Sequence, residues 1–310
     1  MKKNKCFLIT GVAGNIASSL AKFILQKNHD DQIIGVDNFL TGKKKNLPIH
    51  DRFLFFKKDV NKFNQIKFIF ENHKIDYVFH YAACAGVERT LSNPFMVFED
   101  VLGINNIAKL SVEHNIKKIV YASSSEVYGE NSPIPFNEKK SFINPRLPYA
   151  TVKAYGESVF LSLAQRYGLN CNIFRFFNTY GPEQSDDYVI QNFIKKAIKG
   201  EDLVIYGSGN QTRTFLYISD NLEATYNAFL VSNYDNKPIN IGSKHMISVK
   251  DLAKKIIQIC NSKSKIQYLP KRKIGDTSKR QPDNQVFKKL LNRNMTTLDD
   301  GLRRLLNEIY

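Results

Sequence analysis

The sequence contains no tryptophan, only four cysteines and no long apolar run. Cys6, Cys84, Cys171 and Cys260 are far apart, so they form neither a disulfide framework nor a spacing typical of metal ligands. We therefore expect free thiols, no metal site and a cytoplasmic protein. No apolar stretch approaches the ~18 residues of a membrane-spanning helix, and glycines soon interrupt the first one. We expect neither a membrane span nor a targeting segment.

Acidic residues are scarce relative to basic ones, since 29 Asp and Glu face 45 Lys and Arg, a net charge of +16. Such an excess suits nucleic acid, an anionic membrane or an anionic small substrate. The basic residues are spread along the chain, and no RNA-binding, zinc-finger or helix-turn-helix signature accompanies them. We therefore expect no nucleic-acid partner. A generally solvated surface, or a site for a doubly charged diphosphate, accounts for the charge.

Repeats, low-complexity tracts and flexible linkers are also missing, and the first half alternates short apolar segments with longer amphipathic ones. This alternation is typical of a parallel sheet with crossover helices. The expected strands are Cys6–Thr10, Gln32–Val36, Phe53–Phe56, Tyr77–His80, Lys118–Ala122 and Asn170–Phe174. The expected helices lie near Asn15–Gln26, Lys62–Glu71, Pro94–His114 and Pro148–Arg166. The pattern predicts an α/β fold, namely a Rossmann-type doubly wound parallel sheet of six or seven strands.

The regular alternation weakens after about Asn178, where turn signals become denser. A helix near Val189–Lys199 and a strand near Leu203–Ile205 indicate a smaller C-terminal α/β substrate domain. We expect residues 1–177 to form the first domain, with 217–240 returning to it. Residues 178–216 and 241–310 would form the second.

A glycine-rich loop joins the first strand to the first helix, in Thr10-Gly-Val-Ala-Gly-Asn-Ile-Ala17. Gly11 permits a tight turn, and Gly14 lets backbone amides approach a pyrophosphate at the helix N-terminus. Asp37 ends the second strand, where a carboxylate binds ribose hydroxyls and repels a 2′-phosphate. This favours NAD over NADP, although Lys43 to Lys45 lie nearby and could neutralise a phosphate. The predicted cofactor contacts are Gly11, Ala13, Gly14, Asn15, Ile16, Asp37, Asn38, Asp59 and Val60.

Tyr149 and Lys153 stand one helical turn apart, on the same face of an expected helix. Hydride removal from an alcohol carbon requires a base for the hydroxyl proton. A Tyr, with an ordinary pKa of about 10, serves at neutral pH only if a nearby cation stabilises its phenolate. Ser124, at the carboxyl end of the expected fifth strand, can hydrogen-bond the reacting hydroxyl. These residue types predict a hydride-transfer centre.

Together these segments resemble the extended short-chain dehydrogenases of the nucleotide-sugar epimerase/dehydratase group, over nearly the whole chain. Further similar motifs are His80-Tyr-Ala-Ala83, Arg175-Phe-Phe-Asn178-Thr-Tyr-Gly-Pro182 and Tyr206 to Asp220. The resemblance implies that the NAD contacts also include Tyr81, Ala82, Ala83, Asp100, Tyr149, Lys153 and Phe176. It implies that the nucleotide diphosphate sugar contacts Ser124, Ser125, Asn178, Arg213 and Arg280. It also implies a homodimer formed through the helices near Pro94–His114 and Pro148–Arg166.

The reaction implied by the resemblance starts with hydride transfer from carbon 4 of the sugar, which leaves a 4-keto intermediate. A 4-epimerase is the first expectation, and a 4,6-dehydratase, a net carbon-4 dehydrogenase and a uronate decarboxylase are alternatives. Glu126 bears on the choice, because it resembles the Glu with which dehydratases remove the carbon-5 proton. It could equally be a polar turn residue. A non-catalytic Rossmann regulator would lack the Tyr/Lys pair, which is present here.

Two positions depart from the family pattern. Asp100 stands where the family usually has Asn, which places an extra carboxylate near the cofactor and could change a nicotinamide or substrate contact. The tail around Leu291 and Arg293 lacks the usual Leu-Gly-aromatic turn. We therefore expect the last residues to pack differently.

Overall fold

Seven parallel strands form the main sheet of the computed structural model, which describes residues 4–130, 132–270 and 279–309. Their order is β11-β6-β5-β4-β1-β2-β3. The strands are β1 (Cys6–Thr10), β2 (Gln32–Asp37), β3 (Phe53–Lys57), β4 (Tyr77–His80), β5 (Lys118–Ser124), β6 (Asn170–Phe176) and β11 (Lys237–Ile241). The chain builds outward from β1 in one direction and then from β4 in the other. The predicted doubly wound, Rossmann-type parallel sheet is confirmed.

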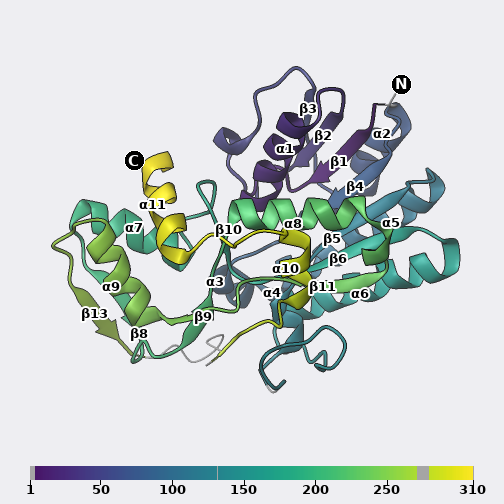
Figure 1. Cartoon of the computed structure of the whole chain (residues 1–310). Helices are drawn as coiled ribbons and strands as arrows, with labels where there is room; N and C mark the ends of the chain where they lie inside the picture. The colour runs from purple at the N-terminus through teal and green to yellow at the C-terminus, as the bar shows by residue number, and fades with distance from the viewer. Residues whose placement is uncertain (1–3, 131, 271–278, 310) are drawn as a thin grey trace.

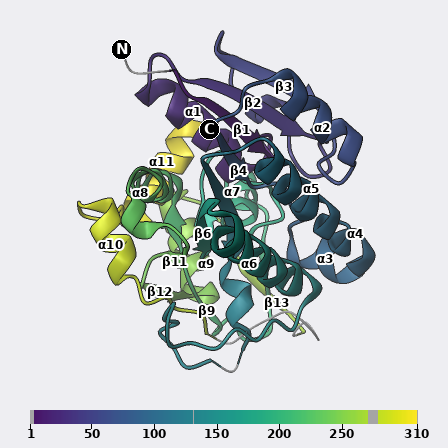
Figure 2. The ribbon, with the colours of Figure 1, turned by 90° about the vertical axis from the view of Figure 1, so that its right-hand side faces the viewer.

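Helices cover both faces of this sheet (Figures 1 and 2). One face packs against α1 (Asn15–Lys27) and α8 (Ile218–Leu230). The other packs against α2 (Phe63–Asn72), α5 (Asp100–Glu113) and α6 (Pro148–Tyr167). Successive strand side chains point to opposite faces, so Phe7 and Ile9 join the first core and Leu8 joins the second. Burial on both faces explains why the strands are continuous apolar runs.

The stretch expected to be helical near Pro94–His114 is helical over nearly its whole length, but it is divided into two helices at Glu99. α4 (Pro94–Phe98) begins at an Asn93 cap whose side chain accepts from the N–H of Met96. The N–H of Leu102 then bonds to the carbonyl of Glu99, three residues back instead of four. This tightened turn separates α4 from α5.

Six further strands form three two-stranded pairs, β10–β7, β12–β9 and β13–β8. Their strands are β7 (Thr179–Tyr180), β8 (Leu203–Tyr206), β9 (Thr212–Thr214), β10 (Leu216–Tyr217), β12 (Met246–Ser248) and β13 (Ile266–Leu269). The helices α7 (Val189–Lys199), α9 (Val249–Ile259) and α11 (Leu298–Ile309) turn their apolar sides into the core shared with α1 and α8. No helix of the described residues has the length and apolarity to cross a membrane.

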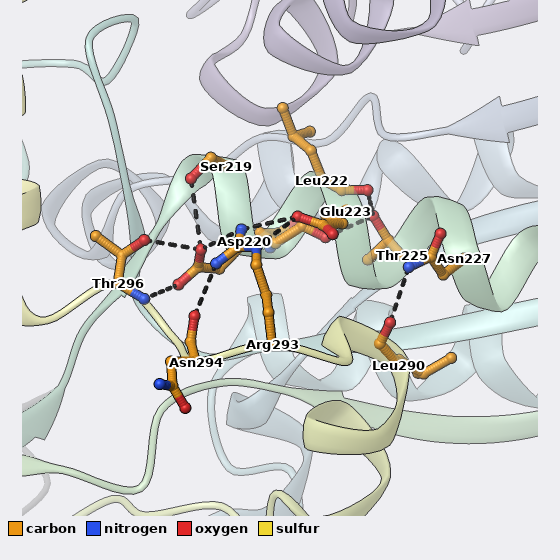
Figure 3. A network of polar contacts seen from close by, with 11 residues as sticks. Ser219, Asp220, Leu222, Glu223, Thr225, Asn227, Leu290, Arg293, Asn294 and Thr296 are labelled. Atoms are coloured by element: carbon orange, nitrogen blue, oxygen red, sulfur yellow. Dashed lines mark hydrogen bonds and ion pairs between the residues drawn. The ribbon is translucent and has the colours of Figure 1, made fainter. Parts of the chain in front are cut away.

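The C-terminal tail, which lacks the Leu-Gly-aromatic turn usual in the family, is held by other contacts. α10 (Gln285–Leu291) ends at Asn292, which takes the left-handed conformation with φ 51°, and Asn is the best substitute for Gly there. Arg293 then pairs with the fully buried Asp220 of α8 at 2.8 Å, and Thr296 donates its N–H to the same carboxylate at 2.7 Å (Figure 3). The tail is therefore anchored to α8 by a buried carboxylate.

Candidate active site

A cleft of about 600 Å³ lies at the carboxyl ends of the central strands, where the strand order reverses between β1 and β4. Open parallel sheets bind ligands at this place. The predicted NAD contacts all line it: Gly11, Ala13, Gly14, Asn15, Ile16, Asp37, Asn38, Asp59, Val60, Tyr81, Ala82, Ala83, Asp100, Tyr149, Lys153 and Phe176. Ser124, Ser125, Glu126, Asn178 and Arg280 line it as well. Arg213, on β9, lies outside the lining that the described residues form.

The glycine-rich loop passes close to the chain that follows β4. Gly11 has φ +70°, and a Cβ there would come within 2.7 Å of the backbone of Ala82. Gly14 is the N-cap of α1, and no side chain caps this helix end. The free N–H groups of the first helical turn and the positive end of the helix dipole therefore suit an anionic group.

Asp37 fixes the shape of this loop from the end of β2. Its carboxylate accepts the N–H of Ala13 at 2.9 Å and that of Phe39 at 2.7 Å. Burial raises the pKa of Asp37, while these two hydrogen bonds favour the charged form. Asn46, which the sequence did not single out, donates to the carbonyl of Ala13 at 2.9 Å and also lines the cleft. Asp37 thus holds the loop in addition to its predicted ribose contact.

Thr10 and His80 hold the other side of the loop. The Thr10 hydroxyl accepts the N–H groups of Tyr81 and Ala82, each at 3.2 Å. Its own hydrogen therefore points to His80 Nδ1, 2.9 Å away, and the ring proton of His80 lies on Nε2. Burial lowers the pKa of His80 to about 3, so the ring is neutral near neutral pH. Neutral His80 thus fixes the Thr10 hydroxyl, which in turn holds the backbone of Tyr81 and Ala82 beside the cleft.

Six side-chain polar atoms of the cleft-lining residues that the structure describes are buried without a hydrogen-bond partner, and two of them belong to predicted NAD contacts. Within the described part of the chain, Asn15 Oδ1 and Tyr81 OH are buried without a hydrogen-bond partner. Buried polar atoms of this kind are costly unless a partner satisfies them. Together with the capless helix end and Asp37, they fit a dinucleotide. No cluster of three or more metal-ligating residues occurs among the residues described.

Tyr149, Lys153 and Ser124 meet in the middle of the cleft. Tyr149 lies in the first turn of α6, and the side chain of Ser124, the last residue of β5, is near enough to oppose the effect of burial on the Tyr149 pKa. The Lys153 ammonium lies 5.6 Å from the centre of the Tyr149 ring and donates to the carbonyl of Ala122 at 2.7 Å. Burial lowers the pKa of Lys153 to about 8 and raises that of Tyr149. Burial thus disfavours the charged form of each group and moves the two pKa values apart.

A buried ion pair supports β5 from behind. Arg175 on β6 donates to Glu157 on α6 through Nη2 at 2.6 Å and through Nε at 2.9 Å. Ser123, next to Ser124, also donates to Glu157. Arg175, the first residue of the R-x-x-N-x-Y-G-P motif, therefore lies behind the cleft lining and connects β6 to α6.

Glu126 faces Arg280 across the cleft. The two side chains form an ion pair, with Nη2 of Arg280 2.8 Å from Oε2 of Glu126. Arg280 is only 6% exposed, so its charge is largely removed from solvent. The side chain of Asn178 turns toward the β9–β10 segment and donates to the carbonyl of Thr214 at 2.9 Å. Of the two arginines expected at the diphosphate, only Arg280 belongs to this lining of described residues.

One wall of the cleft was not recognised in the sequence. It is the segment from Gln184 to Ile190, in which Asp187 pairs with Arg89 of α3 (Val87–Ser92) at 3.1 Å. Tyr188 in this wall also raises the pKa of Tyr149, after burial itself. Nothing in the local pattern marks the segment, because the partners of its charges lie far away in the sequence.

Several proteins that are named by an enzymatic activity are similar to this chain over almost its full length. A UDP-glucuronate 4-epimerase from Thermodesulfobacterium geofontis is 32% identical, over 97% of this chain and 95% of that protein. A UDP-N-acetyl-alpha-D-glucosaminuronate decarboxylase from Bacillus cytotoxicus is 36% identical, over 93% and 92%. Among solved structures, UDP-glucose 4-epimerase from Thermotoga maritima with UDP-glucose has a TM-score of 0.91 and 28% identity, covering 98% of each chain.

The sequence model of the NAD dependent epimerase/dehydratase family matches residues 7–242, from β1 to the end of β11. This range includes the glycine-rich loop, Asp37, Ser124 and the Tyr149–Lys153 pair. NAD is the cofactor of this family, and the relatives above are named as enzymes of nucleotide sugars. The chain is therefore an NAD-dependent enzyme and belongs to the NAD dependent epimerase/dehydratase family.

Proposed function

We propose that the protein is a nucleotide-sugar 4-epimerase, which inverts carbon 4 of a sugar carried on a nucleotide diphosphate. The observation that carries this proposal is that Tyr149, Ser124 and Lys153 line one cleft, with the Lys153 ammonium buried 5.6 Å from the centre of the Tyr149 ring. In the proposal Tyr149 is the base and Ser124 orients the hydroxyl that reacts. The cleft beside them provides for both cofactor and sugar.

Each catalytic side chain has one task in this proposal. The chemistry that bound NAD would supply is reversible hydride transfer at carbon 4 of the sugar. Tyr149 takes the proton of the 4-hydroxyl and later gives it back. Lys153 stabilises the Tyr149 phenolate through its charge, and Ser124 orients the hydroxyl that reacts. Arg280 offers its guanidinium to the anionic part of the substrate.

Glu126 favours epimerisation among the possible outcomes. Removal of the carbon-5 proton, as dehydration requires, needs an unengaged carboxylate base. Here both oxygens of Glu126 are taken up by Arg280. Epimerisation needs no second base, because the same carbon loses and regains the hydride.

The Glu126–Arg280 pair also supports a second candidate, a uronate decarboxylase. A uronate oxidised at carbon 4 is a β-keto acid, which loses carbon dioxide without a base. Arg280 can pair with the sugar carboxylate before it leaves, and a water molecule can supply the proton that carbon 5 then needs. The Bacillus cytotoxicus relative is named as a decarboxylase of such a substrate.

The division of the chain follows from the same proposal. We assign residues 1–177 and 217–240 to the cofactor, and residues 178–216 and 241–310 to the nucleotide sugar. The four cysteines are free thiols, which agrees with a cytoplasmic location.

Substrate identity separates these candidates in one experiment. The purified protein is incubated with NAD and with UDP-glucuronate, UDP-N-acetylglucosaminuronate, UDP-glucose or UDP-N-acetylglucosamine. We expect one of them to give a product of unchanged mass with the opposite configuration at carbon 4, by mass spectrometry and NMR. Loss of carbon dioxide would assign the decarboxylase. Loss of water, or an accumulating keto sugar with net cofactor reduction, would contradict both.

A second copy of the chain is proposed to cover the face formed by α4, α5 and α6. These helices pack against one another and leave Phe95 79% exposed and Leu102 53% exposed (Figure 2). Apolar side chains gathered on neighbouring helices suit a homodimer interface.

Leu102→Glu is expected to convert this dimer into a monomer, because it would bury a charge in an apolar interface. Light scattering after size-exclusion chromatography measures the mass. Leu230→Glu makes the same change at a side chain that is 52% exposed at the end of α8, and should leave the dimer intact. A wild-type monomer would contradict the proposal.

A further inference from the structure

We propose that Asn240 is a positioning residue for the nucleotide-sugar site, whose side-chain amide holds Arg280 and Glu126 at a fixed separation in the cleft. This role rests on the proposed function, in which Arg280 meets the anionic part of the substrate. Asn240 lies on β11 and is fully buried. It is absent from the cleft lining that the described residues form, so it would act through the two segments that it connects.

The first segment that Asn240 holds is the one that carries Glu126. Glu126 and Tyr128 belong to the short 3₁₀ helix η2 (Ser125–Tyr128), which follows β5 directly. The Tyr128 hydroxyl donates to Oδ1 of Asn240 at 2.7 Å. Nη1 of Arg175 donates to the same hydroxyl oxygen at 2.9 Å, so the hydroxyl keeps its own hydrogen for Asn240. The helix that carries Glu126 is therefore fixed to β11.

The second segment is the one that carries Arg280. Phe136, in the loop between η2 and α6, pairs with this segment as a short parallel bridge. The N–H of Phe136 donates to the carbonyl of Gln281, and the N–H of Asp283 donates to the carbonyl of Phe136, both at 2.8 Å. Nδ2 of Asn240 donates to the same carbonyl of Phe136 at 2.8 Å, and to that of Asp283 at 3.4 Å. Asn240 therefore holds the bridge on which the segment of Arg280 depends.

The amide of Asn240 is fixed in its orientation. Its oxygen faces the Tyr128 donor and its nitrogen faces the Phe136 carbonyl, so a rotated amide would set like groups against each other. The backbone N–H of Asn240 also donates to Oε1 of Glu138 at 2.9 Å. One rigid side chain therefore sets the spacing between the two segments.

Arg280 and Glu126 meet in the cleft where these two segments face each other. Nη2 of Arg280 lies 2.8 Å from Oε2 of Glu126, and Nε of Arg280 is buried without a hydrogen-bond partner in the described part of the chain. A guanidinium binds phosphate or carboxylate through a planar fork of donors, which demands a narrow geometry. A displaced segment would misplace this fork. We therefore expect Asn240 to affect the affinity for the substrate and not the chemical step at carbon 4.

Asn240→Leu tests this role, because leucine keeps the branched shape of the side chain and removes its donor and its acceptor. UDP is the probe, since it carries the diphosphate without a sugar, and its Kd is measured by isothermal titration calorimetry on the NAD-loaded protein. We expect the Kd of N240L to rise about tenfold, as for the loss of one hydrogen bond to a charged group. With the nucleotide sugar that the panel identifies, KM should rise by a similar factor while kcat changes by less than about twofold.

A double variant shows whether Asn240 acts through Arg280. Arg280→Gln alone should weaken the binding of UDP. In that background, N240L should raise the Kd by no more than about twofold, because the group that it misplaces is already gone. Losses that simply multiply would show that Asn240 supports the cleft without positioning Arg280, and would overturn the inference.

Asn172→Leu is the matched control. Asn172 is also fully buried, and its amide donates to the carbonyl of Tyr234 at 3.0 Å, outside the described cleft lining. The same chemical change should there cost stability and leave the Kd of UDP at the wild-type value. Equal losses of UDP affinity in N172L and N240L would contradict a specific role of Asn240.

Asn137→Ala decides the matter if N240L does not fold. Nδ2 of Asn137 donates to Oδ2 of Asp283 at 2.9 Å, which is a second link to the segment of Arg280 from a side chain that is only partly buried. N137A should raise the Kd of UDP about threefold, the effect of one weaker hydrogen bond. An unchanged Kd in N240L, or in N137A where N240L is unfolded, would overturn the inference.

Failure of the proposed function gives a different result. A wild-type protein that binds UDP but converts no nucleotide sugar would remove the 4-epimerase proposal and leave the positioning role of Asn240 to be decided by the Kd values. A wild-type protein that does not bind UDP would overturn the role of Arg280, and the role of Asn240 with it.

Discussion

Tyr149→Phe is expected to lower kcat by about three orders of magnitude, the middle of the range for loss of a positioned acid–base group. Phe keeps the ring beside Lys153 and removes only the hydroxyl that would take the substrate proton. Cofactor binding and the midpoint of thermal unfolding should therefore change little. Turnover is measured on the substrate found by the panel, and bound NAD by its release on denaturation.

Tyr155→Phe provides the control for that variant. Tyr155 lies on the same helix, is 37% exposed, and donates its hydroxyl to Asn105 outside the cleft. The same chemical change should there leave kcat within about twofold, because surface changes rarely matter. Equal activity of Y149F and wild type would refute the assignment of Tyr149 as the base.

Glu157→Ala is expected to reduce the free energy of unfolding by about 3–5 kcal/mol, which is a large part of the stability of a typical domain. The Arg175–Glu157 pair has side chains only 4% and 6% exposed. Alanine would leave the Arg175 guanidinium buried without its counter-charge, and Ser123 without its acceptor. Urea denaturation followed by circular dichroism measures the change.

Two further variants show whether the reduced unfolding free energy of E157A comes from an unpaired buried charge. Glu71→Ala removes one partner of the Lys67–Glu71 pair, whose side chains are 45% and 51% exposed, and should cost at most about 0.5 kcal/mol. Replacing Glu157 and Arg175 together by Met should recover much of the stability, because no buried charge remains. A cost below about 1 kcal/mol for E157A would show that water or a neighbouring group compensates Arg175.

The regular elements could be predicted from the sequence because their signals are local. The strands Cys6–Thr10 and Tyr77–His80 and the helix Val189–Lys199 have the expected bounds, since each is one apolar or amphipathic run. The break at Glu99 could not be predicted, because it depends on a single backbone hydrogen bond.

Contacts between residues that are far apart in the sequence could not be predicted either, because no local pattern indicates them. Nothing near Glu126 indicates that it pairs with Arg280, 154 positions later. Asn46 could not be recognised as a support of the glycine-rich loop, because its contact with Ala13 depends on tertiary folding. The residue types of the candidate catalytic centre could be predicted from the sequence. The ion pairs and hydrogen bonds around them could not.

The hydrogen bonds around Ala13 have a consequence for the thermodynamics of cofactor association. Its N–H is held by Asp37, and its carbonyl accepts from Lys43 and Asn46, all within the protein itself. The loop therefore has little conformational entropy left to lose when a dinucleotide arrives. Preorganisation of this kind strengthens binding without adding a contact. We therefore expect the loop to need no rearrangement when it binds the pyrophosphate.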